Sequence, residues 1–183
     1  MKKLFLAIAL TALTSWSAQA AVTVIGSKEG EACYLAASSP FGTSGIGDCD
    51  QALRSGALDK GETAGTYVNR GILYLRAQNF DAALKDFEEA LRIVPGMPEA
   101  YVNRGNAYFM QGKYEAALSD YDAAILGETK QIYAAYYNRG LVRERLGQKD
   151  QAIEDFKTAN ALRPGWQEPR DKLVYYGVTP AEE

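Results

Sequence analysis

The stretch YVNRG stands at residues 67–71 and again at 101–105, and YYNRG stands at 136–140. The glycines that end the three stretches are 34 and then 35 residues apart. A period of this length is typical of a helical repeat array, in which one unit cannot bury its apolar face alone. Stacked units bury a continuous core and leave an extended concave surface. The spacing therefore predicts an all-α chain that binds a partner.

The repetition extends well beyond the pentapeptide. When the segments 64–97, 98–131 and 133–166 are overlaid, small residues recur 12 and 19 residues after each repeated glycine, and an aromatic residue lies between them. Small residues let two helices approach closely, and large aromatic side chains fill the space beside them. Each segment therefore predicts an antiparallel helix pair. The small residues are Ala83, Ala90, Ala117, Ala124, Ala152 and Ala159, and the aromatic residues are Phe87, Tyr121 and Phe156.

This pattern resembles the tetratricopeptide repeat (TPR) family, and the resemblance covers about 100 residues. It implies a TPR-like α-solenoid made of antiparallel helix hairpins. The third segment departs from the other two, because Arg143 and Lys149 replace aromatic residues there. The segment 167–183 reads as a capping helix, which covers the last apolar face of such arrays, followed by a short tail.

Each arginine of the pentapeptide is followed 16 residues later by an aspartate. In an antiparallel hairpin the two positions lie about equally far from the turn, so we expect them to face each other. We favour a structural ion pair repeated in every unit, and the alternative is a row of arginines for an anionic ligand. The pairs are Arg70 with Asp86, Arg104 with Asp120, and Arg139 with Asp155.

The flank 21–63 is less regular, with short helices predicted at 31–37 and from residue 48. Cys33 and Cys49 in this flank are also 16 residues apart. An even pair of cysteines in an exported chain reads first as a disulfide. We expect it to staple a degenerate leading hairpin, in the place that the ion pair holds in the repeats. A redox role is the alternative, although the pair is not a C-x-x-C motif.

Residues 1–20 have the layout of a secretory signal peptide, with Lys2 and Lys3 before an apolar run and a small-residue cleavage site ending at Ala20. We therefore expect a soluble periplasmic or secreted protein without a membrane span. Removing the two lysines leaves 18 basic against 23 acidic residues, a net charge of −5. This balance argues against nucleic acid as a partner.

The chain contains no histidine, which removes His-based catalytic triads and the commonest zinc and haem ligand. We expect no enzymatic activity, no catalytic residues, no metal and no cofactor. Clusters such as Glu88 and Glu89 read more simply as solvated helix faces. An enzyme built without histidine is the least favoured alternative.

In the TPR family the first helix of each unit lines the concave groove, so the resemblance implies where a peptide would bind. Side chains three and four residues apart share one side of a helix. Met110 and Arg145 lie on the same faces. The expected peptide-binding groove consists of Val68, Asn69, Ile72, Leu75, Val102, Asn103, Asn106, Phe109, Tyr137, Asn138 and Leu141.

The row formed by Asn69, Asn103 and Asn138 has two interpretations of equal weight. Each amide can exchange hydrogen bonds with a peptide backbone, or it can bond a neighbouring helix inside the array. One subgroup of the family clamps C-terminal carboxylates of chaperones with Lys, Arg and Asn. The chain matches that clamp only at Asn103 and has Val68 and Ala134 among the residues where cations belong, so we reject this activity.

The leading function is a non-enzymatic adaptor or scaffold of the cell envelope that binds a peptide or protein segment. The alternative is a self-associating structural protein of the envelope, which the 12 tyrosines make worth testing. Sedimentation at several concentrations separates the two.

Overall fold

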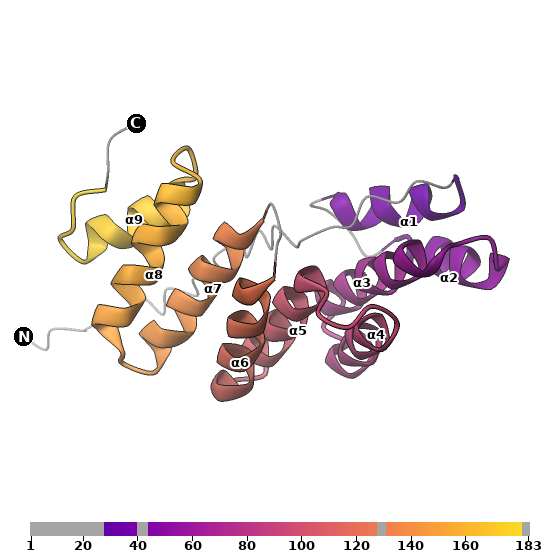
Figure 1. Cartoon of the computed structure of the whole chain (residues 1–183), viewed down its shortest axis with the longest axis horizontal. Coiled ribbons are helices and arrows are strands. Elements are labelled where there is room, and N and C mark those ends of the chain that lie inside the picture. Colours follow the sequence, from indigo (N-terminus) through magenta and orange to yellow (C-terminus); the bar gives the residue numbers. More distant parts are fainter. Residues whose placement is uncertain (1–27, 40–43, 128–130, 181–183) are drawn as a thin grey trace, which may run out of the picture.

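The computed structural model describes residues 28–39, 44–127 and 131–180. Over these residues the chain forms helices and no strands, which confirms the all-α class. The helices follow one another along the length of the molecule, from α1 and α2 at one end to α9 at the other (Figure 1). They are α1 (Lys28–Ser38), α2 (Ile46–Ser55), α3 (Lys60–Arg76), α4 (Phe80–Ile93), α5 (Pro98–Met110), α6 (Tyr114–Leu126), α7 (Ile132–Arg145), α8 (Lys149–Leu162) and α9 (Gln167–Tyr175).

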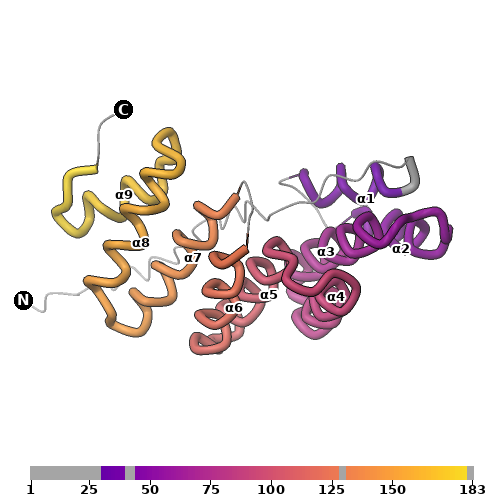
Figure 2. Tube along the Cα trace, viewed as in Figure 1, coloured from indigo at the N-terminus to yellow at the C-terminus, as the bar shows by residue number. Residues whose placement is uncertain are grey.

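Helices α3 to α8 form three hairpins, in which α3 packs on α4, α5 on α6 and α7 on α8. Each hairpin also contacts the next one in the chain, and the Cα trace shows the successive turns of this array (Figure 2). The turn inside each hairpin contains one residue in the left-handed region, with φ of 58° at Gln78 and 73° at both Gly112 and Gly147. Gln78 therefore holds a conformation that the other two units assign to glycine, which adopts it without strain.

The repeated glycine of each unit packs directly beneath the aromatic ring of its partner helix. A Cβ atom on Gly71 would lie 2.5 Å from Cε1 of Phe87, and one on Gly105 or Gly140 would lie 2.7 Å from the ring of Tyr121 or Phe156. The three rings are completely buried. The pentapeptide glycine is therefore required by a close helix approach, which any larger residue would obstruct.

The helices α1 and α2, here called the leading hairpin, pack on each other and on α3. Cys33 and Cys49 form a disulfide between them, with an S–S distance of 2.09 Å. The sequence Asp48-Cys49-Asp50 aligns with Asp86-Phe87-Glu88 of the first repeat. Cys49 therefore stands at the position of the aromatic ring and Cys33 at that of the glycine. The disulfide takes the place of the glycine–aromatic contact and not, as expected, of the ion pair.

The far end of the array is closed by α9, which packs on α8. Leu173 of α9 is buried with Phe156 of α8, and Tyr176 packs against this cluster. The helix bounds differ slightly from the expected segments, since α3 begins at Lys60 and α1 begins at Lys28. The expected signal peptide at 1–20 and the last three residues of the tail lie outside the described residues.

Candidate functional site

The arginine of each repeat lies against the aspartate 16 residues later, on the other helix of the same hairpin. Arg70 donates from Nε and Nη2 to the Asp86 carboxylate at 2.8 and 2.7 Å, and Arg104 makes the same two bonds to Asp120. Arg139 Nη2 lies 2.6 Å from Asp155 Oδ1. The three aspartates are almost completely buried. These bidentate contacts are the stronger form of the arginine–carboxylate interaction.

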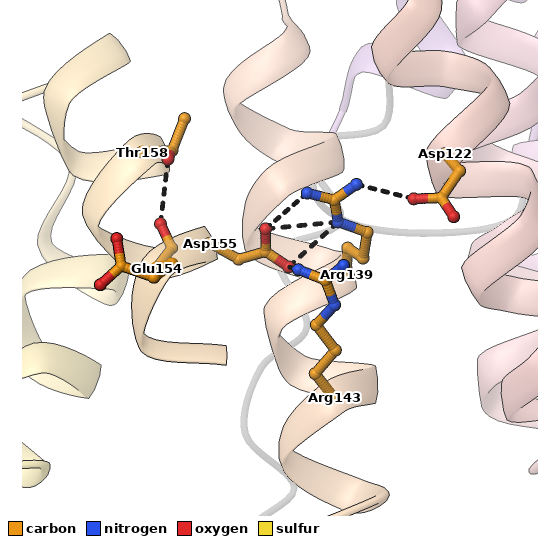
Figure 3. Close-up of polar contacts among 6 residues, drawn as sticks. All are labelled: Asp122, Arg139, Arg143, Glu154, Asp155 and Thr158. Atoms are coloured by element: carbon orange, nitrogen blue, oxygen red, sulfur yellow. Dashed lines mark hydrogen bonds and ion pairs between the residues drawn. The ribbon is translucent and has the colours of Figure 1, made fainter. Parts of the chain in front are cut away.

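Two of these arginines also bond an acidic residue of the preceding hairpin. Arg70 Nη1 lies 2.6 Å from Asp50 of α2, and Arg139 Nη1 lies 2.6 Å from Asp122 of α6. Figure 3 shows the guanidinium of Arg139 between Asp122 and Asp155. Each of these arginines therefore joins three helices. The sequence did not predict these bonds, and Asp122 reads there as part of a solvated helix face, although Asp50 and Asp122 each follow the cysteine or aromatic position of their unit by one residue.

The unusual residues of the third repeat take part in this network and in the cap. Arg143, which stands where the other units have tyrosine, places Nη1 2.7 Å from Oδ2 of Asp155 (Figure 3). Lys149 lies over the ring of Tyr176, with Nζ 5.3 Å from the ring centroid. The departures from the repeat pattern thus bring two cations to the end of the array, where one bonds a buried carboxylate and the other an aromatic ring.

The charge states of the first pair follow from its geometry. The hydrogen bond to Asp86 is the largest effect that raises the pKa of Arg70. Burial raises the pKa of Asp86, and the hydrogen bonds from Arg70 oppose that shift. The guanidinium groups are thus engaged with carboxylates of the same chain. This arrangement favours the structural interpretation over a row of arginines for an anionic ligand.

The three asparagines of the pentapeptide are all buried, and their amides differ in what they contact. Asn138 Nδ2 donates to Asn106 Oδ1 of α5 at 2.9 Å. Asn103 Nδ2 donates to the Glu99 carbonyl of its own helix at 2.8 Å. Asn69 is completely buried, and neither of its amide atoms has a hydrogen-bond partner among the described residues. The row is therefore not a uniform ladder.

Asn106 is the centre of a small buried network that joins three helices. Its Oδ1 accepts from the Tyr121 hydroxyl of α6 at 2.8 Å as well as from Asn138 of α7. Tyr121 is the only hydroxyl-bearing ring at its repeat position, where the other units have phenylalanine, and the residue equivalent to Asn106 is Ile72 or Leu141 there. Burial raises the pKa of Tyr121. The second repeat therefore contains both the tyrosine hydroxyl of Tyr121 and its acceptor Asn106, whereas the other two repeats have apolar residues at both positions.

Most of the expected groove is interior, which corrects the expectation of an open surface. Eight of its eleven side chains are between 0 and 8 % exposed, because neighbouring helices cover them. Val68, Ile72 and Leu75, for example, belong to one core cluster with Phe87 and Ala107. The eight residues are Val68, Asn69, Ile72, Leu75, Val102, Asn103, Asn106 and Asn138.

The other three expected residues, Phe109, Tyr137 and Leu141, are half-buried. Tyr137 and Leu141 pack against the cluster of Phe156 and Leu173. Burial raises the pKa of Tyr137 to about 12, and the nearby carboxylates of Glu168, Glu144 and Asp171 act in the same direction.

Polar contacts also join α9, and Tyr176 directly after it, to the C-terminal end of α7. Lys172 Nζ lies 2.6 Å from Glu144 Oε2, and the Tyr176 hydroxyl donates to Glu144 Oε1 at 2.6 Å. The capping helix thus packs beside the half-buried residues of α7. It leaves less of the first-helix surface open at this end of the array than a row of bare repeats would.

The accessible remainder of this face lies between the ends of α5 and α7. Met110 is 41 % exposed, and Arg145 is exposed with its guanidinium carbon 5.6 Å from the centroid of the Phe109 ring. In the part of the chain that the structure describes, Arg145 forms no ion pair with a carboxylate. We call Phe109, Met110 and Arg145 the open patch. It combines apolar surface with one cation.

The described residues offer neither a metal-binding cluster nor a helix that could cross a membrane. Within 28–39, 44–127 and 131–180, no group of three or more His, Cys, Asp or Glu side chains is placed to hold a metal ion. No helix in the same part of the chain has the length and apolar character needed to cross a bilayer.

Comparison with known families matches the repeats to two TPR models. One covers residues 68–131 and the other 133–166, which together account for more than half of the chain. The chain belongs to the tetratricopeptide repeat family. TPR arrays are generally interaction modules and not enzymes, and the hairpins described above are their structural unit. No curated protein matches the chain.

Solved TPR structures resemble this fold. MamA is 26 % identical, with 72 % of this chain and 79 % of that chain covered and a TM-score of 0.58. The first TPR of Spaghetti (RPAP3), bound to the HSP90 peptide SRMEEVD, is 25 % identical, covers 62 % of this chain and 90 % of that chain, and has a TM-score of 0.58. YrrB, described as a TPR protein with an unusual peptide-binding site, is 18 % identical over 71 % of this chain and 64 % of that chain, with a TM-score of 0.58. This last likeness concerns the fold alone.

Proposed function

We propose that this TPR protein is an exported, non-enzymatic adaptor that binds a peptide or protein segment at the open patch. The observation that carries the proposal is the exposure of Met110 beside the Arg145–Phe109 contact, on a face whose other side chains are mostly covered. Aromatic residues, methionine and arginine are the residue types that interaction surfaces are enriched in. The first TPR of RPAP3, which resembles this fold, is bound to an HSP90 peptide, and this supports peptide binding as a function for the array.

The chemistry of the open patch indicates which segments it accepts. Phe109 and Met110 offer contact to an apolar side chain, and Arg145 offers charge-assisted hydrogen bonds to a carboxylate. We therefore propose a segment in which an apolar residue lies close to an acidic one. We do not propose the chaperone carboxylate clamp, because Val68, Ile72 and Ala134 are buried apolar residues where that clamp has cations or polar groups.

Substitution of Met110 by glutamate is expected to abolish peptide selection without unfolding the chain. Display of random peptides against the immobilised protein should enrich an apolar–acidic motif with the wild type and fail to enrich it with Met110→Glu. Loss of an interface anchor of this kind lowers affinity at least tenfold, or about 1.4 kcal/mol. Circular dichroism checks the fold of each variant.

Leu126→Glu is the matched control, because Leu126 is 88 % exposed on α6 and lies outside the open patch. It should select the same motif as the wild type. Equal selection by Met110→Glu and the wild type would exclude the open patch, and a wild-type protein that enriches no motif would exclude peptide binding there.

Export is the second part of the proposal and rests on the leader at residues 1–20. Expression of the full gene product in a bacterial host is expected to give a mature chain that begins at Ala21 in the envelope or the medium. Intact-mass measurement of the fractionated protein tests this. A full-length chain retained in the cytoplasm would contradict it.

Self-association is a second candidate, favoured by exposed apolar side chains at the C-terminal end. Leu162, Val174 and Tyr175 are 49, 64 and 77 % exposed. A sedimentation coefficient that rises with protein concentration and returns to the monomer value in Tyr175→Glu would favour this candidate over an adaptor that acts as a monomer.

A further inference from the structure

The leading hairpin lacks both cross-helix contacts that hold the three repeats together. The disulfide stands at the position of the glycine–aromatic contact. The position of the repeat arginine is occupied by Ala32, and Asp48, at the position of the repeat aspartate, is exposed. The contact between α1 and α2 therefore depends on the disulfide more than the helix contacts inside the three repeats depend on any single bond.

The leading hairpin covers one stripe of α3. This stripe consists of Thr66, Asn69, Leu73 and Arg76, which are spaced three and four residues apart and so share one side of the helix. Cys33 Sγ lies 3.8 Å from the Thr66 carbonyl oxygen, and Leu73 is buried in a cluster with Cys33 and Cys49. Arg76 donates to the carbonyls of Ala37 and Ser39 at the end of α1, at 2.6 and 2.7 Å.

Asn69 lies in the middle of this stripe. Its burial beneath the leading hairpin is unfavourable in free energy. Its side chain is completely buried, and neither amide atom is hydrogen-bonded. The equivalent Asn138 donates to Asn106 on α5, the first helix of the preceding hairpin, and the leading hairpin supplies no such acceptor to Asn69. Burying an amide without a hydrogen-bond partner costs free energy. This cost favours a state in which the leading hairpin is detached from α3.

We propose that the Cys33–Cys49 disulfide is a latch, and that its reduction releases the leading hairpin from α3 while the three repeats stay folded. A dithiol reductant supplies the electrons. One of its thiolates attacks a cysteine sulfur and forms a mixed disulfide. Its second thiol then resolves that bond, leaving two cysteine thiols and the oxidised cyclic reductant. Both sulfurs are completely buried, so the reductant reaches them after a local opening of the hairpin.

Release of the leading hairpin uncovers the α3 stripe. Thr66, Asn69 and Leu73 are all completely buried in the closed state. Once uncovered, they present an apolar surface with a free amide and a hydroxyl at the N-terminal end of the array. The oxidised and reduced proteins thus differ in accessible surface even though their repeats are the same.

Hydrogen exchange of the whole chain, with and without dithiothreitol, tests the latch. On reduction, amides of α1 and α2 should lose protection by about 100-fold, the effect of opening a loop of this size. Amides of α5 to α8 should be unchanged. The variant Cys33→Ala/Cys49→Ala should exchange like the reduced protein whether or not the reductant is present.

Asn69→Leu provides the opposite change, because it removes the unpartnered amide and keeps a side chain of similar size. After reduction, amides of α1 and α2 should be about tenfold more protected in this variant than in the reduced wild type. Unchanged protection of α1 and α2 in the reduced wild type would overturn the proposal. So would simultaneous loss throughout the repeats, or equal protection of α1 and α2 in reduced Asn69→Leu and the reduced wild type.

Discussion

Replacement of Asp155 by alanine is expected to lower the free energy of unfolding by about 3–5 kcal/mol. The carboxylate accepts hydrogen bonds from both Arg139 and Arg143 and is almost completely buried. Its removal leaves two guanidinium groups, whose side chains are only 14 and 21 % exposed, without their central counter-charge. Urea denaturation followed by circular dichroism at constant pH measures the effect.

Asp122→Ala is the control for this prediction, since Asp122 bonds the same Arg139 from a side chain that is 56 % exposed. Exposed ion pairs contribute about 0–1 kcal/mol. The two aspartate variants should therefore differ by several kcal/mol although they share a partner. Similar small losses in both would mean that the buried pairs contribute no more than surface contacts do.

Replacement of Asn106 by leucine is expected to cost about 2–4 kcal/mol, because it removes the acceptor of two buried donors. The hydroxyl of Tyr121 and the amide of Asn138 would both lose their partner. The size of the side chain is not the cause, since Leu141 occupies the same position in the third repeat. Thermal and urea unfolding of the variant measure the loss.

Adding Tyr121→Phe to this variant should rescue part of the loss, because the double variant then carries the same two side-chain types as Leu141 and Phe156 of the third repeat. In the wild-type background the same change leaves Asn106 with Asn138 alone and is expected to destabilise. A double-mutant cycle isolates the coupling between the two sites. Strictly additive losses would show that the hydroxyl and the amide do not depend on each other.

The fold could be predicted from the sequence because its signal is periodic. The pentapeptide recurs with small and aromatic residues at constant offsets, and such offsets determine which helix faces meet. The proximity of Arg70 to Asp86 follows from the register of a hairpin, because both lie equally far from the turn. The all-α array and the TPR family are confirmed by the structure and by the family models.

The candidate site could be predicted less well, because periodicity says which side of a helix a residue occupies but not what covers that side. Val68 and Ile72 lie on the expected face, yet the next helices bury them. The contact of Asn106 with Tyr121 did have a signal. Both residues are polar in the second repeat and apolar in the other two. The unpartnered amide of Asn69 had no such signal, because what covers it depends on how the leading hairpin docks on α3.

The arginine contacts differ from one junction to the next, and this has a consequence for how the array melts. Arg70 and Arg139 each reach an acid in the hairpin before their own, whereas Arg104, among the described residues, forms an ion pair with Asp120 alone. In a linear array, cooperativity depends on the energy of each nearest-neighbour junction. The junction between α4 and α5 instead rests on apolar packing, since Ala100 and Ala107 of α5 share the core cluster of α3 and α4, and we expect its stability to depend less on salt concentration than that of the other two junctions.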